Sequence, residues 1–347
     1  MKQLIFILSV VVGLASCSNP QPKDEQQEKN EKVNQAKAVD SMLEDSALIN
    51  LNEAIRSDIN NPSLYVKRAK YFDSIGDNNA AIQDLDRAYK LDSTNLNTLI
   101  AQANFLGKRG KVVMSLNILE NAKQLYPEDA KIYVAMSELF LMGKNNERSL
   151  KNADLAIKHD QFNADAYYLK GYNFLEMGDT SKAISSYRTA VEQNPDFLEA
   201  YLELGLIFSA KDDPIALQYY NNALDVNPTE KRALYSKGMY EQEHELYNEA
   251  IQSYYAATKA HPKFKEAYYN LGYVHMYYLK LYREALPYFT DAVEIDPNYY
   301  QAYYNRGYTF ELMGDINNAA KDYRKALSIM PDYDLAANGL TRVTEGI

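Results

Sequence analysis

The feature that most constrains this chain is a pattern of small and large residues that returns about every 34 positions. Its clearest copy, residues 164–197, reads ADAYYLKGYNFLEMGDTSKAISSYRTAVEQNPDF. Gly178 and Asp179 separate two helical patterns, because glycine suits the left-handed residue that ends a helix and aspartate caps the next helix. Pro195 ends the second pattern. We therefore expect a hairpin of two helices.

The same template recurs through most of the chain. From an alanine early in the second helix, it requires a bulky residue four positions later, alanine seven later and proline twelve later. Five copies satisfy it in full and three upstream copies in part, with Ser93 and Gln161 in two of the proline positions. A small residue at the eighth position of each unit, or its equivalent, would let the two helices approach closely. The eight predicted units are 62–95, 96–129, 130–163, 164–197, 198–230, 231–264, 265–299 and 300–333.

This period and pattern resemble the tetratricopeptide repeat (TPR) family over roughly residues 45–345. The chain departs from the family where Tyr or Leu replaces the usual tryptophan, and at Ser93 and Gln161. The resemblance implies an all-α fold, a right-handed α-solenoid of tandem TPR helix-turn-helix hairpins without internal domain boundaries. Residues 41–61 and 334–347 are expected to form capping helices at the two ends.

The first residues have the character of a secretion signal. Lys2 precedes an apolar run over 4–15, which is too short to span a membrane. The stretch Leu14-Ala15-Ser16-Cys17 resembles the lipobox of bacterial lipoproteins, whose cysteine is lipidated, and Cys17 is the only cysteine of the chain. The resemblance implies a signal peptide over 1–16 and membrane attachment through a lipid on Cys17. An ordinary signal peptide with an incidental cysteine is the alternative.

Residues 17–40 are predicted to be a disordered tether, because they are rich in Gln, Asn, Lys and Glu and contain no aromatic residue. Ser18 stands where an aspartate would retain an enterobacterial lipoprotein at the inner membrane, so we expect an outer-membrane lipoprotein that faces the periplasm. Lys23-Asp24-Glu25 resembles a surface-export signal, which leaves the cell surface as an alternative location.

Charge and motifs argue against several classes of function. A net charge of −10 without basic clusters argues against nucleic-acid binding. The four histidines have no metal-ligand spacing, and no GxSxG, Walker or GxGxxG motif occurs. We expect no catalysis, no cofactor and no metal site.

Tyrosine is the unusual residue of this chain: of 31 tyrosines, 26 lie between residues 164 and 333. Many occupy core positions of the template. A second set lies at the fifth and ninth positions of the first helix, turned about 100° per residue from the core stripe. These residues are Tyr168, Tyr172, Tyr235, Tyr269, Tyr273, Tyr304 and Tyr308.

In TPR proteins this face lines the concave groove that holds ligands, so the resemblance implies a peptide or protein partner there. Met239 and Met276 are expected to share the face. Asn270 and Asn305 resemble two rungs of the family's asparagine ladder, which binds peptide backbone. The nearby charges are mainly acidic, so the family's carboxylate clamp, which needs groove lysines, is not expected. Aromatic packing between adjacent repeats is the alternative role for these tyrosines.

Two functions remain open. The first is a non-enzymatic adaptor or scaffold lipoprotein of the bacterial cell envelope. The second is a glycan-binding lipoprotein of a nutrient-uptake system. Every unit is close to 34 residues, which leaves no inserted loop to build a sugar site, and tryptophan is absent. These observations favour the adaptor.

Overall fold

A computed structural model describes residues 46–346. The predicted signal peptide 1–16, the lipidated Cys17 and the tether 17–40 lie outside the described residues. The chain divides after Arg56 into two compact units. Of the predicted capping helix over 41–61, the structure describes a helical segment from residue 46 to residue 57.

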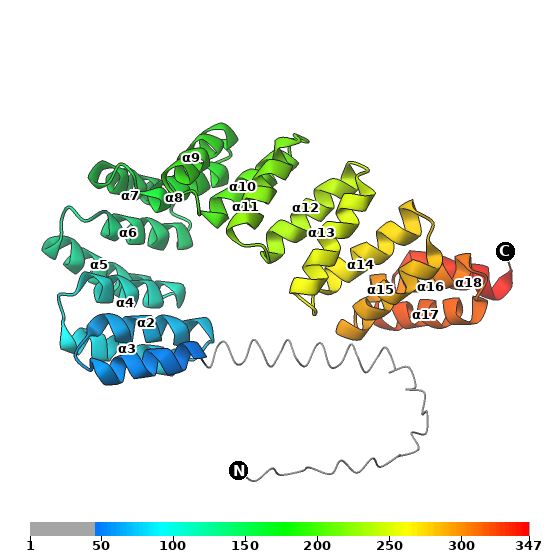
Figure 1. The fold of residues 1–347 in the computed structure, drawn as a ribbon, viewed down its shortest axis with the longest axis horizontal. Helices are drawn as coiled ribbons and strands as arrows, with labels where there is room; N and C mark the ends of the chain where they lie inside the picture. Colours follow the sequence, from blue (N-terminus) through cyan, green and yellow to red (C-terminus); the bar gives the residue numbers. More distant parts are fainter. Residues whose placement is uncertain (1–45, 347) are drawn as a thin grey trace, which may run out of the picture. The chain divides into compact units, whose positions relative to one another are not determined.

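From residue 62 onward, helices follow one another as antiparallel pairs in sequence order, with no strand in the described residues (Figure 1). The first four pairs are α2 (Pro62–Ser74) with α3 (Asn78–Leu91), α4 (Leu96–Lys108) with α5 (Val112–Leu125), α6 (Ala130–Met142) with α7 (Asn146–His159), and α8 (Ala164–Glu176) with α9 (Thr180–Gln193). The next four are α10 (Leu198–Ser209) with α11 (Ile215–Val226), α12 (Lys231–Glu243) with α13 (Tyr247–Ala260), α14 (Lys265–Tyr273) and the π-helix η1 (Val274–Tyr278) with α15 (Tyr282–Ile295), and α16 (Tyr300–Leu312) with α17 (Ile316–Ile329). Helix α18 (Asp334–Glu345) follows the last pair. The prediction of an all-α fold of tandem hairpins is confirmed.

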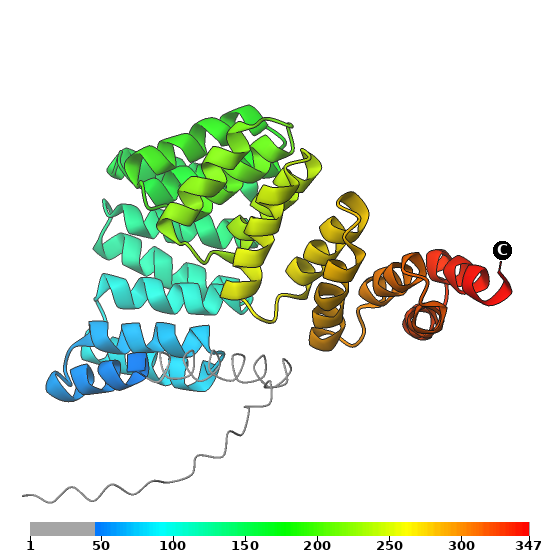
Figure 2. The same ribbon diagram turned by 45° about the vertical axis from the view of Figure 1, so that its right-hand side comes forward.

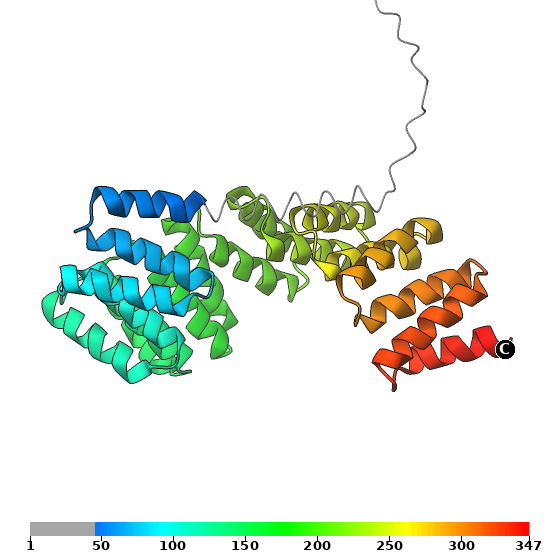
Figure 3. The same cartoon turned by 90° about the horizontal axis from the view of Figure 1, so that it is seen from below.

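Each hairpin packs on the next one along the chain, and the same order can be followed from two other directions in Figures 2 and 3. Contacts join the second helix of one pair to the first helix of the next, as between α7 and α8, and also consecutive first helices, as between α4 and α6. The core is therefore continuous along the stack, as expected for repeats that bury their apolar faces on their neighbours.

The turns inside the hairpins follow the predicted chemistry in three units. Gly178 has φ +81°, and the Asp179 side chain accepts a hydrogen bond from the Lys182 backbone N–H at 3.1 Å. In four other hairpins a residue with a side chain takes the left-handed conformation, although this is costly for L-residues. These residues are Lys144, Asp212, Glu245 and Lys280, with φ between 54° and 62°.

Small residues at the eighth position face large rings on the second helix. A Cβ atom added to Gly171 would lie 2.7 Å from the Tyr187 ring, and one added to Gly205 would lie 2.5 Å from the Tyr220 ring. Both rings are almost fully buried. The glycines are thus required by the close approach of ring and helix.

Replacing Gly205 with alanine is expected to lower the free energy of unfolding by about 1–3 kcal/mol, because the new methyl group overpacks the contact with Tyr220. Chemical denaturation monitored by circular dichroism measures the loss. Gly143→Ala is the control, since its nearest contact would be an ordinary 3.5 Å and its φ is −80°. Equal midpoints for the two variants would contradict the packing described here.

Two hairpins contain a buried ion pair at matching positions. In the last hairpin, Arg306 Nε donates to Asp322 Oδ2 at 2.7 Å and Nη2 donates to Oδ1 at 2.9 Å. The Asp322 side chain is only 4% exposed and that of Arg306 18%. The first hairpin repeats this bidentate geometry with Arg68 and Asp84, at 2.7 Å for both bonds. Each pair joins the seventh position of the first helix to the second helix.

Candidate functional site

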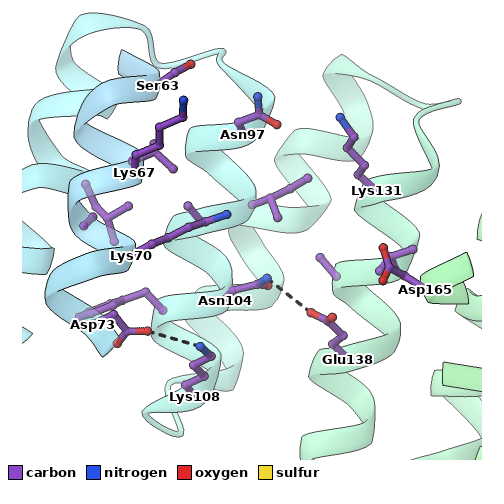
Figure 4. Close-up of a pocket in the computed structure, with 18 of the residues that line it drawn as sticks. Ser63, Lys67, Lys70, Asp73, Asn97, Asn104, Lys108, Lys131, Glu138 and Asp165 are labelled. Atoms are coloured by element: carbon purple, nitrogen blue, oxygen red, sulfur yellow. Dashed lines mark hydrogen bonds and ion pairs between the residues drawn. The ribbon is translucent and has the colours of Figure 1, made fainter. Parts of the chain in front are cut away.

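The first helices of the first four units line a pocket of about 850 Å³ (Figure 4). Its walls come from α2, α4, α6 and the start of α8. Half of the lining residues occupy the second, fifth and ninth positions of their units, and the fifth and ninth are the positions that hold tyrosines in later units. By position, they are Ser63, Asn97, Lys131 and Asp165, then Val66, Ile100 and Val134, then Lys70, Asn104 and Glu138.

The pocket exists here because the fifth position carries aliphatic residues. Val66, Ile100 and Val134 form an apolar floor together with the alanines Ala101 and Ala135. In four of the five later units the fifth position is a tyrosine, whose ring occupies the corresponding space. The smaller side chains at this position therefore leave room for the pocket in units one to three.

One side of the pocket is basic. Lys67 and Lys70 on α2 are exposed, as is Lys131 on the opposite wall beside Asp165 (Figure 4), and none of their ammonium groups makes an ion pair within the described residues. Lys108 differs, since its Nζ lies 3.4 Å from Asp73 Oδ2. In Figure 4, Lys70 extends from α2 towards Asn104 on α4. Three uncompensated positive charges thus border one cavity.

The other side is acidic. Glu138 extends from α6 towards Asn104, whose Nδ2 donates to Glu138 Oε2 at 3.4 Å (Figure 4). Burial raises the pKa of the Glu138 carboxyl, and Asp165 raises it further, against the opposing charge of Lys108. Burial also raises the pKa of Asp165, and Glu199 adds to this effect. The two lysines that line the pocket near these carboxyl groups, Lys108 and Lys131, form no ion pair with them within the described residues.

The pocket was missed by the sequence analysis, because the expectation about groove lysines concerned the tyrosine-bearing face, whereas the pocket lysines lie in units one to three. Lys67 and Lys70 lie on the same helical face as Val66, and Lys131 lies at a second position. The predicted binding face was placed in units four to eight because most tyrosines lie there. Comparing the ninth positions of the first three units, which are Lys70, Asn104 and Glu138, would have revealed the change from lysine to acid across the pocket.

The predicted tyrosines at fifth positions pack between hairpins. The Tyr168 ring lies 5.5 Å from that of Tyr187 and 5.1 Å from that of Phe197, and burial raises the pKa of Tyr168 to about 12. Tyr235, Tyr269 and Tyr304 each contact a second-helix ring and an aromatic residue before the next hairpin in the same way. This is the packing role that the sequence left as the alternative.

The residues predicted at ninth positions are half-buried. The Tyr304 and Tyr308 rings are parallel, with centroids 6.2 Å apart. Tyr172 packs against the core cluster of units four and five, and Met239 packs against that of units six and seven. Part of each of these ninth-position side chains remains exposed at the surface.

The two predicted asparagines are buried and link neighbouring hairpins. Asn270 Nδ2 donates to the Tyr235 hydroxyl at 3.2 Å, and Asn305 Nδ2 donates to the Tyr269 hydroxyl at 2.8 Å. Asn270 is 7% exposed and Asn305 5%. Both amides therefore bond to the tyrosine of the preceding unit.

The prediction that Met276 shares the exposed face is wrong, because its side chain is 2% exposed and packs on Ala285 and Phe289. Met276 lies in the π-helix η1, where the wider i→i+5 turn changes the direction of side chains relative to an α-helix. The same segment continues a row of stacked rings that the sequence did not predict. Tyr273 lies between Tyr269 at 6.3 Å and Tyr277 at 5.2 Å, and the Tyr277 side chain is exposed.

Neither a metal site nor a membrane-spanning helix is found within residues 46–346. No cluster of three or more His, Cys, Asp or Glu side chains there is arranged to hold a metal ion. No helix in this part of the chain has the length and apolar character needed to cross a membrane.

Comparison with known proteins identifies the repeats. Models of the tetratricopeptide repeat match residues 62–95, 212–263, 235–276, 265–299 and 300–333, and a TPR repeat model matches residues 171–212. The type IV pilus assembly protein PilF of Pseudomonas aeruginosa is 30% identical over 113 residues, which are 32% of this chain and 45% of that protein. This chain spans less than half the length of the curated relatives that it matches.

Solved structures share the fold. The C-terminal part of a TPR repeat-containing protein from Cytophaga hutchinsonii has a TM-score of 0.60 at 18% identity, covering 70% of this chain and 99% of that chain. The crystal structure of the APC/C hetero-tetramer Cut9–Hcn1 has a TM-score of 0.52 at 17% identity, covering 87% of this chain and 58% of that chain.

Proposed function

Because the chain is a tetratricopeptide repeat protein, we propose that it is a non-enzymatic scaffold that binds a segment of a protein partner on the first helices of its hairpins. The observation that carries this proposal is the pocket of about 850 Å³, which crosses four consecutive hairpins. A cavity that continues from repeat to repeat suits an elongated chain, and its apolar floor beneath polar walls can hold both side chains and backbone.

The glycan-binding alternative has less support. Sugar recognition by aromatic residues needs exposed ring faces, whereas the fifth-position tyrosines stack on core rings and Tyr273 stacks on its neighbours. The pocket itself is lined by aliphatic and charged side chains, with Phe105 as its one aromatic residue. A protein partner fits these surroundings better.

A crosslinking experiment tests the scaffold function. A photoreactive phenylalanine at Asn97, which is exposed at the pocket, is compared with the same residue at Lys321 on the second helix α17. We expect one dominant protein to be crosslinked from position 97 in native envelopes and not from position 321. Identical crosslinking patterns from the two positions would contradict a binding role for the first-helix surface.

We further propose that the scaffold works in the bacterial cell envelope, as a lipoprotein anchored in the outer membrane through Cys17. The support comes from the sequence, where residues 14–17 read Leu-Ala-Ser-Cys after an apolar run, and from the similarity to PilF, which is named as a pilus assembly protein. The repeats would face the periplasm, or the exterior if Lys23-Asp24-Glu25 acts in export. One plausible role is the assembly of an envelope machine.

Replacing Cys17 with serine is expected to abolish lipidation and to release the protein from the membrane fraction, since the acyl chains supply the membrane affinity. Fractionation after a carbonate wash, with labelled palmitate incorporation as the second readout, measures the effect. A Cys17→Ser chain that stays with the membranes would rule out the lipid anchor.

A further inference from the structure

We infer that the pocket of α2, α4, α6 and α8 selects a bipolar segment of the partner: carboxylate side chains against Lys67 and Lys70, an apolar residue on the floor, and Lys or Arg side chains against Glu138 and Asp165. This inference rests on the proposed function and adds the chemistry of the partner. The elements that support it are the two oppositely charged sides of one cavity and the apolar surface between them.

The basic side sets the first requirement. Lys67 and Lys70 project from successive turns of α2, whereas Lys131 projects from the start of α6, on the wall that also carries Glu138 (Figure 4). Their ammonium groups have no ion-pair partner in the described part of the chain, so an arriving carboxylate would displace no internal contact. Lysine offers a mobile point charge, which suits carboxylates whose positions vary along a flexible segment.

The acidic side sets the second requirement. Glu138 and Asp165 lie near each other and near Glu199, and both carboxyl groups have a raised pKa because they are partly buried beside like charge. A cationic side chain would relieve this repulsion. An acidic residue in the same place would increase it, so an entirely acidic segment fits one side of the pocket and is repelled by the other.

The floor sets the third requirement. Val66, Ile100 and Val134 stand at the fifth positions of three consecutive units and line the same pocket as the lysines and the acids. Apolar surface left open to water in a cavity gains from contact with an apolar side chain. Along α2, α4, α6 and α8, the bound segment should therefore present acidic side chains first, then an apolar one, then basic ones.

Synthetic peptides of one composition test the inference. One peptide carries an acidic block, an apolar centre and a basic block, a second has the reverse order, and a third has the same residues alternating. Acidic-apolar and basic-apolar peptides complete the set. Binding to the purified full chain is measured by fluorescence anisotropy at low and at physiological salt.

We expect one of the two block orders to bind at least about tenfold more tightly than the alternating, the acidic-apolar and the basic-apolar peptides. Lys67→Glu with Lys70→Glu should weaken that peptide about tenfold or more. The matched control is Lys321→Glu with Arg324→Glu, which are also three residues apart and exposed, on the second helix α17. The control should bind as the unchanged chain does, and circular dichroism should show equal helix content for all variants.

Two results would overturn the inference. One is an acidic-apolar peptide that binds as tightly as the best block peptide, which would mean that Glu138 and Asp165 make no contact. The other is equal loss of binding in the pocket and control variants, or no preference among the peptides. In either case crosslinking of a partner from position 97 could still occur, so the proposed scaffold function would be judged separately.

Discussion

Replacing Arg306 with alanine is expected to destabilise the last hairpin by about 3–5 kcal/mol, because the nearly inaccessible Asp322 carboxylate loses its bidentate partner. Thr290 loses a weaker contact at 3.3 Å. Arrays of repeats need not unfold as a single cooperative unit, so the effect is best measured by hydrogen exchange in α16 and α17. Amides there should exchange much faster than those of α2 and α3.

Two further variants test whether the stability lost in Arg306→Ala comes from the unpaired buried charge. Arg306→Leu with Asp322→Leu should be far less damaging than Arg306→Ala alone, since neither charge is left buried without a partner. Lys182→Ala, which removes an exposed ion pair with Asp179, should change stability far less, because solvent and salt screen exposed pairs. If Arg306→Ala and Lys182→Ala change hydrogen exchange equally, the buried ion pair stabilises the protein no more than an exposed one.

Tyr254→Ala is expected to cost about 3–5 kcal/mol, as truncation of a large buried aromatic residue does. Its side chain is fully buried against Gly238, and its hydroxyl donates to Gln242 Oε1 at 3.1 Å. Tyr273→Ala with Tyr308→Ala should cost less because both side chains are only half-buried. If the partner extends beyond the pocket to units seven and eight, this double variant should weaken binding by about thirtyfold, the effect of losing an anchor worth about 2 kcal/mol.

Partner recovery and melting temperature, measured side by side, separate the two roles. We expect Tyr254→Ala to melt early and the double variant to melt close to the unchanged chain while it recovers less partner. A double variant that melts as badly as Tyr254→Ala, or that keeps its partner in full, would show that Tyr273 and Tyr308 serve packing alone.

The fold could be predicted because the repeated pattern of small and large residues specifies the geometry of each hairpin. The glycine at position 171 and the ring at position 187 are spaced so that one fits the other, and the same spacing returns down the chain. Each copy supports the others, so a weak unit with Gln161 in place of proline does not disturb the assignment. Periodic small and large residues specify hairpins directly.

The candidate site was harder to predict because it depends on small side chains at one repeated position. Val66, Ile100 and Val134 are unremarkable as single residues, and only their shared position creates a hollow. Met276 was misplaced because a π-turn is not visible in an α-helical periodicity. The role of Asn270 was misjudged because its amide bonds to Tyr235, a residue of the unit before.

Because of these asparagine links, the contacts that join consecutive hairpins differ between the two ends of the array. The bonds from Asn270 to Tyr235 and from Asn305 to Tyr269 form a chain of polar joints across the last three hairpins, each joint buried and reinforced by rings. At the pocket end, the fifth positions carry aliphatic side chains and no such hydroxyl. The first two hairpins are joined instead by the less buried ion pair of Arg109 with Asp73 at 2.7 Å, so we expect hydrogen exchange to open the pocket end before the last three hairpins.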